Sequence, residues 1–247
     1  MSGFFYQLLY RPLFNALVFL YQTIGLKDLG ISIILLTVVI RLVLYPLFYK
    51  SYKNQKLLQK IQPEMKKIQH THKDNREKQA QALMELYKQH QVSPFSGFFL
   101  ILIQLPILIA LYRVFFNGFS AQTLTSVYDF ITAPQEINHS FLGLIDLAKP
   151  HIIIVGLAAL AQYFQGWLSL PKTVSGQTLT APERMTKQMV YMGPALTLII
   201  LYSLPAAIGL YWLVTSIFST IQQFFINKSV NQATPNGKIS IPNKTSS

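Results

Sequence analysis

The stretch of sequence that decides the fold runs from Leu29 to Tyr49 and reads LGISIILLTVVIRLVLYPLFY. It is apolar over about the length that a helix needs to cross a hydrocarbon core. Arg41 is its one charged residue, and an arginine near the centre of a spanning helix costs about 2.5–3.5 kcal/mol on insertion scales. Arg41 lies about 12 Å of helix from Tyr49, which is too deep to reach the headgroups easily. We therefore expect it to face a wet cavity inside the protein.

The composition of the whole chain is that of a membrane protein. Of 247 residues, 51% are hydrophobic and 12% are charged, about half the charge of a typical soluble domain. Half of the net charge of +12 comes from one hydrophilic segment, residues 50–92. Membrane orientation explains such a segment better than direct nucleic-acid binding does. The chain has no cysteine, which excludes disulfides and thiolate metal sites, and no metal or cofactor is expected.

Five apolar segments predict an all-α, polytopic bundle with five transmembrane helices. They cover residues 29–49, 95–116, 151–170, 188–203 and 206–227. Pro205 separates the last two, which therefore form a tight hairpin with almost no loop.

The two ends of the chain differ from this core, which covers residues 29–227. Residues 1–28 form an external segment, and Arg11 and Pro12 interrupt its apolar part, residues 4–25. This favours an amphipathic helix that lies along the membrane surface, with a sixth span as the alternative. Residues 228–247 are polar and predict a disordered cytoplasmic tail.

Basic residues set the orientation. The segment 50–92 has ten Lys and Arg against four acids, so we expect it in the cytoplasm. With five spans, 16 of the 21 basic residues fall on that side. The N-terminus is then outside and the C-terminus inside. A sixth span would bring the N-terminus inside without moving the other loops.

The cytoplasmic segment 50–92 predicts a helical hairpin. Apolar residues recur at three- and four-residue steps on both sides of a polar turn at residues 72–75, where Asp74 or Asn75 would cap the second helix. Pro63 is expected to kink or interrupt the first helix. The alternative is a solvated hairpin with no role in function.

Polar residues recur on single faces of several predicted spans. Thr37, Arg41 and Tyr45 lie four residues apart and share a face of the first span. Each polar residue alone is more often a packing hydrogen bond than a functional group, but together they indicate a hydrophilic groove. The candidate groove residues are Arg41, Thr37, Tyr45, Gln104, Gln162, Gln165, Tyr211, Trp212, Thr215 and Ser219.

The sequence contains no pattern typical of catalysis. It has no nucleophile–base pair, no HExxH, no nucleotide-binding loop and no intramembrane carboxylate for a proton relay. A small transporter or anion channel with Arg41 as the anion site is the rival interpretation. It fits less well because the five spans show no internal repeat. A purely structural scaffold would leave the buried arginine unexplained.

Several short strings follow one another over roughly residues 8 to 226. They are YRPLFN (10–15), LLTVVIRL (35–42), IQPEMKKI (61–68), LYK (86–88), SPF (93–95), QLPI (104–107), MGP (192–194), LPA (204–206) and LYW (210–212). In this order they resemble the YidC/Oxa/Alb family of membrane protein insertases, in a minimal five-span bacterial form. Arg41 falls on that family's groove arginine. Ser216 departs from the pattern, because members often carry Asn there.

The resemblance implies an insertase and chaperone for new integral membrane proteins, and not an enzyme. It also implies a bacterial plasma (inner) membrane location and a substrate groove centred on Arg41. Pro63, Glu64, Lys66 and Lys67 match the family's cytoplasmic hairpin. Expected partners are nascent membrane proteins and the lipid bilayer, with the ribosome and the Sec translocon as further partners. The tail has only three lysines, which argues against ribosome docking through it.

Overall fold

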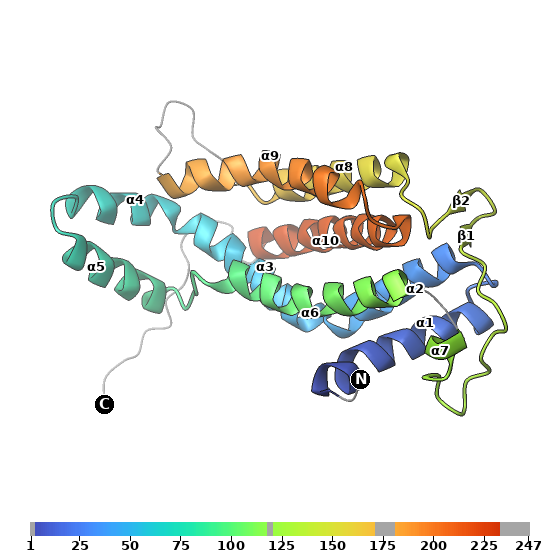
Figure 1. Ribbon diagram of the computed structural model, residues 1–247. Helices are drawn as coiled ribbons and strands as arrows, with labels where there is room; N and C mark the ends of the chain where they lie inside the picture. The colour runs from blue at the N-terminus through green and yellow to red at the C-terminus, as the bar shows by residue number, and fades with distance from the viewer. Residues whose placement is uncertain (1–2, 118–120, 171–180, 233–247) are drawn as a thin grey trace.

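The computed structural model describes residues 3–117, 121–170 and 181–232, and most of them are helical. Several long helices lie side by side, a helical hairpin (α4 and α5) projects from one end, and a loop with two short strands covers the other end (Figure 1). A π-helical turn, Tyr6–Tyr10, leads into the first helix. The helices are α1 (Arg11–Thr23), α2 (Leu29–Val43), α3 (Tyr45–Lys60), α4 (Gln62–Thr71), α5 (Arg76–Gln89), α6 (Ser96–Asn117), α7 (Ala121–Leu124), α8 (Ile152–Leu168), α9 (Ala181–Leu201) and α10 (Ala206–Gln232).

The first expected span is bent. The apolar stretch 29–49 belongs to α2 and the start of α3, whose axes differ by 67°. Pro46 explains the break, because it has no N–H to continue the helical ladder and its ring crowds the preceding turn. The sequence prediction of one straight helix to Tyr49 is therefore corrected: α2 ends at Val43.

Among the described helices, only α6, over Ser96–Phe116, is long and apolar enough to cross a membrane by itself. The bent pair α2 and α3 is a second candidate if it counts as one span. Two further apolar helices, Ile152–Leu168 and Lys187–Leu201, are shorter. Helix α10 has 27 residues, but polar side chains lower its mean hydropathy. Five spans therefore stay a prediction.

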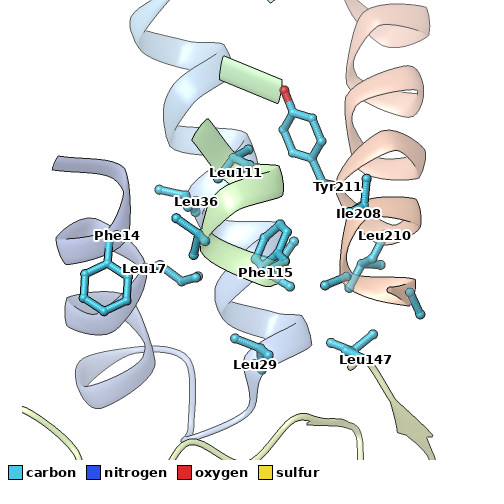
Figure 2. Packing of buried hydrophobic residues seen from close by; sticks show 14 of the residues in the cluster. Phe14, Leu17, Leu29, Leu36, Leu111, Phe115, Leu147, Ile208, Leu210 and Tyr211 are labelled. Atoms are coloured by element: carbon cyan, nitrogen blue, oxygen red, sulfur yellow. The ribbon is translucent and has the colours of Figure 1, made fainter. Parts of the chain in front are cut away.

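The first helix is part of the hydrophobic core. Phe14, Leu17 and Val18 of α1 are fully buried, and α1 packs against α2 and α6. Figure 2 shows Leu17 beside Leu36 of α2, in the same cluster as residues of α6 and α10. One face of α1 is thus buried by protein, as an amphipathic helix requires. Whether residues 4–25 lie on the membrane or span it stays open.

The loop between α6 and α8 is tied to α1 by hydrogen bonds. Asn15 is 1% exposed; its Nδ2 donates to the carbonyl of Ser126 at 3.1 Å, and its Oδ1 accepts from the backbone N–H of Tyr128 at 2.6 Å. Arg11 Nε also donates to the Ser126 carbonyl, at 3.3 Å, and its guanidinium stacks on Tyr128. A buried asparagine with both ends of its amide engaged fixes this loop against the first helix.

A small β-hairpin closes the loop over the start of α2. Strands β1 (Ser140–Phe141) and β2 (Ile145–Asp146) pair antiparallel. One Asp28 carboxylate oxygen caps α2 at the N–H of Ile31, 2.9 Å away, and the other accepts from the N–H of Leu142 at 2.6 Å. A single carboxylate therefore joins the helix end and the hairpin.

Segment 50–92 contains the helical hairpin that the sequence predicts, formed by α4 and α5. The break before α4 falls at Ile61, and Pro63 occupies the first turn of α4, where a proline costs no hydrogen bond. Asn75 caps α5 by accepting from the N–H of Lys78 at 2.9 Å. Apolar side chains from both arms form a separate cluster around the buried Ile61 and Leu86. Glu64 pairs with His90 at 3.3 Å across the hairpin, which further ties the two arms together.

The C-terminal helix is longer than predicted. Helix α10 continues to Gln232, so residues 228–232 are helical and do not belong to the expected disordered tail. The rest of that prediction, for residues 233–247, lies outside the described residues, as do residues 1–2, 118–120 and 171–180.

Candidate functional site

Arg41 is enclosed by protein in the last turn of α2. Its side chain is 4% exposed, and its guanidinium lies over the ring of Phe48, 4.2 Å from the centroid. This cation–π contact stabilises a buried cation by about 0.5–2 kcal/mol. Nη1 is buried and has no hydrogen-bond partner among the described residues. Arg41 is therefore a buried cation whose hydrogen-bonding capacity is not filled by the protein.

The facing helix α10 presents a stripe of buried polar side chains. Tyr211, Thr215, Ser219 and Gln222 are each at most 9% exposed, and α10 packs against α2, α3 and α8. Within the described residues, Ser219 Oγ and Gln222 Oε1 are buried without a partner, as Arg41 Nη1 is. Buried polar atoms normally have partners. Several unfilled ones on facing helices mark a place suited to water or to polar groups of a bound chain.

Gln104 of α6 and Thr37 of α2 complete this region. Tyr211 points away from α10 toward α2 and α6 (Figure 2), and its hydroxyl accepts a hydrogen bond from Gln104 of α6. Thr215 lies one helical turn further along α10, and its buried Oγ1 has no partner among the described residues. Thr37 is 1% exposed and donates to the carbonyl of Ile33 in its own helix at 2.6 Å. The region around Arg41 is therefore contributed by α2, α6 and α10.

Tyr45, which the sequence predicts for the groove, turns away from Arg41. Tyr45 follows the bend at Leu44, so its side chain leaves the row of Thr37 and Arg41 and is 38% exposed. Only its backbone carbonyl takes part, accepting from Gln222 Nε2 at 3.4 Å. The single shared face predicted for Thr37, Arg41 and Tyr45 is therefore corrected, because it assumed an unbroken helix.

The predicted glutamines of α8 belong to a second polar contact. The carbonyl oxygen of Gln162 accepts a hydrogen bond from Thr197 of α9, which is the usual interhelical role of such residues. Gln165 is half-buried one turn further along α8, and Trp212 packs at the edge of the main core. None of these three residues has a recorded contact with Arg41.

A pocket lies next to this region, and Arg41 is not among the residues that line it. Tyr52 and Gln59 of α3, the end of α8 at Ser169, and Gln223 and Ile226 of α10 line it. Phe48, Tyr52 and Ile226 form a buried cluster. Because Phe48 touches Arg41 while Tyr52 and Ile226 line the pocket, this cluster lies between the two.

Sequence reasoning missed the residues that close this region. Phe48 reads as an ordinary apolar residue, and no local signal could have found its contact with Arg41, because the bend between α2 and α3 creates it. Gln59 and Ser169 carry no signal, because polar residues in a hydrophilic segment and at a helix end are usually solvated. Their contact joins positions 110 residues apart.

Comparisons with known proteins agree on one family. The family described as 60Kd inner membrane protein matches residues 19–233. The chain is 31% identical over 232 residues to a membrane protein insertase YidC of Geobacter sulfurreducens, covering 92% of this chain and 39% of that protein. A membrane protein insertase YidC of Rickettsia bellii is 30% identical, with 92% and 40% covered.

The fold is also similar to a solved structure, a crystal structure of an active YidC insertase with the first transmembrane domain resolved. The TM-score is 0.59 at 24% identity, and the match covers 89% of this chain and 46% of the other. The chain spans about two fifths of the length of the curated relatives it matches.

Proposed function

Because this chain belongs to the 60Kd inner membrane protein family, we propose that it inserts newly made integral membrane proteins into the bacterial plasma membrane and helps them to fold. The observation that carries the proposal is Arg41, a buried cation with an unfilled nitrogen on α2, together with the buried, unfilled polar atoms of α10, the helix that packs against α2. Such a region stabilises polar parts of a chain that hydrocarbon would leave without hydrogen bonds.

The topology that we propose uses five spans. They are α2 with the start of α3, then α6, α8, α9 and α10, with the N-terminus outside and the hairpin α4–α5 in the cytoplasm. The count of basic residues supports this orientation. Single cysteines at Lys73 and Gln122 of the cysteine-free chain test it with an impermeant thiol reagent. Labelling of position 73 from outside would overturn it. The expected positions of Ser2, Gln177 and Ser247 lie outside the described residues.

In the proposed mechanism the client's polar translocated tail enters the region around Arg41. The guanidinium attracts acidic groups of the tail, and the α10 stripe offers hydrogen bonds. The apolar segment of the client then leaves into lipid along α8 and α10, driven by burial of its own surface. Because Arg41 is 4% exposed, α2 and α10 have to separate before a client can reach it.

The cytoplasmic hairpin is the proposed receiving element. Its two arms have their own apolar cluster, so it can move relative to the bundle without losing its internal packing. Pro63, Glu64, Lys66 and Lys67 lie on its first arm, α4. The ribosome and the Sec translocon are the partners we propose for it, because a basic cytoplasmic hairpin offers a docking surface.

The test is insertion of single-span clients into liposomes that contain the purified protein. Arg41→Ala is expected to fold at least as well as wild type, because the cost of burying a charge disappears. It should lose insertion of clients with acidic tails and keep that of clients with neutral tails. Arg41→Lys, which keeps the charge, should retain much of the wild-type rate unless the planar fork itself is required.

Two results would count against this function. Wild-type rates in Arg41→Ala for acidic and neutral clients alike would remove Arg41 from the mechanism. Uptake of small anions by the same liposomes, without insertion of any client, would indicate the transporter alternative.

A further inference from the structure

Four of the nine residues that line the pocket between α3, the end of α8 and α10 have amide side chains. Gln55 and Gln59 come from α3, and Gln223 and Asn227 come from α10, with Ser169 and Lys56 beside them. It is a small site that is open to solvent. A helix is about 10–12 Å wide with its side chains, so the site can contact a peptide group of an extended main chain but cannot hold a folded element.

A chain of hydrogen bonds shapes the pocket wall. Lys56 Nζ donates to Gln59 Oε1 at 3.2 Å, Gln59 Nε2 donates to the Ser169 carbonyl at 2.6 Å, and Ser169 Oγ donates to Gln223 Oε1 at 2.9 Å. Gln223 is 5% exposed. These bonds connect α3, the end of α8 and α10, so Gln59 and Gln223 are held in place by protein and are not loose surface side chains.

Amides are the side chains that match a polypeptide backbone. The Gln and Asn side chain carries one carbonyl acceptor and one NH₂ donor, which are the same groups that each peptide unit offers. A site made from them binds extended chain without selecting its side chains. An insertase that handles many clients needs such a sequence-independent contact.

The pocket leads toward Arg41 but is separated from it. Phe48, Tyr52 and Ile226 are each at most 7% exposed and pack together, with Leu100 of α6 beside them. Tyr52 and Ile226 form part of the pocket wall, and the other side of the cluster is the Phe48 ring that holds Arg41. A client polypeptide that moves from the pocket to Arg41 must displace this apolar cluster.

We propose that this amide pocket is the first binding site for a client's extended backbone on the cytoplasmic side, ahead of the apolar cluster and Arg41. The inference rests on the proposed insertase function and adds a site to it. The pocket recognises main chain, whereas Arg41 recognises charge. A client therefore meets a contact that ignores its sequence before one that depends on its charge.

The first test is photocrosslinking in liposomes. A photoreactive amino acid at Gln55, on the pocket wall, is expected to form an adduct with a client stalled during insertion. The control places it at Lys53, which lies on the same helix and is exposed. Adducts from both positions alike, or adducts from position 55 to lipid alone, would overturn the proposal.

The second test separates main-chain from charge recognition. In the double variant Gln55→Leu and Asn227→Leu, two amides are lost while the bonded residues Gln59, Ser169 and Gln223 are kept. Two lost hydrogen bonds should weaken apparent client affinity roughly tenfold, to the same extent for acidic and neutral tails. Arg41→Ala should instead discriminate between the two tails.

The outcomes distinguish failure of the amide site from failure of the proposed insertase function. If wild-type protein inserts clients but the double variant matches it, or loses acidic clients only, the amide site is wrong and the insertase function stands. If wild-type protein inserts no client, the proposed function fails and this inference fails with it.

Discussion

Asn15 offers a sharp test of how the loop between α6 and α8 is held. It lies on α1 with 1% of its surface exposed. Its Nδ2 donates to the carbonyls of Arg11 and Ser126 at 2.8 and 3.1 Å, and its Oδ1 accepts from the N–H of Tyr128 at 2.6 Å. Asn15→Ala removes all three bonds while the backbone partners stay in place.

The size of the effect follows from the partners left behind. Each buried polar group that loses its partner costs about 1–3 kcal/mol. The Arg11 carbonyl already serves its own helix, and the Ser126 carbonyl keeps its bond from Arg11 Nε. Among the described residues, the Tyr128 N–H has no acceptor besides Asn15 Oδ1. We therefore expect a loss of about 2–3 kcal/mol in the free energy of unfolding. Most of it comes from the Tyr128 N–H, which is left without an acceptor, and the rest from the two carbonyls that each lose one hydrogen bond.

The assay is reversible denaturation in detergent micelles, followed by circular dichroism, together with proteolysis of the loop 121–138. Gln22→Ala is the matched control, because Gln22 also bonds a loop carbonyl, that of Thr132 at 3.2 Å, but in an exposed position. Water replaces that bond, so the control should change stability by less than about 0.5 kcal/mol. Equal stability of the two variants, with no faster proteolysis for Asn15→Ala, would refute the reasoning.

Three further predictions concern other contacts. In Gly30→Ala the new Cβ would lie 2.1 Å from the Phe141 ring, so the free energy of unfolding should fall by about 1–3 kcal/mol. Adding Phe141→Ala should restore part of this loss. If Gly30→Ala alone is as stable as wild type, the β-hairpin does not pack there. Gln104→Leu removes the hydrogen-bond donor to the buried Tyr211 hydroxyl and should lower the free energy of unfolding by about 1–3 kcal/mol. A double-mutant cycle with Tyr211→Phe should show coupling between the two residues. Additive effects of the two substitutions would contradict this hydrogen bond. Asn75→Ala removes the cap of α5 and should destabilise that helix by about 0.5–2 kcal/mol, seen as faster amide exchange in its first turn and nowhere in the bundle.

Local sequence patterns determined most of the helices and the hairpin of α4 and α5. Spacing of apolar residues predicted its two arms, Pro63 predicted the interruption that the structure places at Ile61, and the cap predicted at Asp74 or Asn75 is Asn75. These features depend on residues within a few positions of one another, so the sequence is sufficient to predict them. The wet cavity that the sequence predicts around Arg41 stays a prediction, because the structure shows the side chain buried. The family could be predicted from the order of short motifs along the chain.

The tertiary structure decided which polar residues meet. The bend before Pro46 takes Tyr45 out of the row of Arg41 and brings Phe48 onto the guanidinium. Gln162, predicted for the groove, bonds Thr197 of the next helix instead. Such partners are set by the rotation and spacing of whole helices, which depend on packing summed over many contacts far apart in sequence. Periodicity fixes the face on which a residue lies, but it does not fix the helix that this face meets.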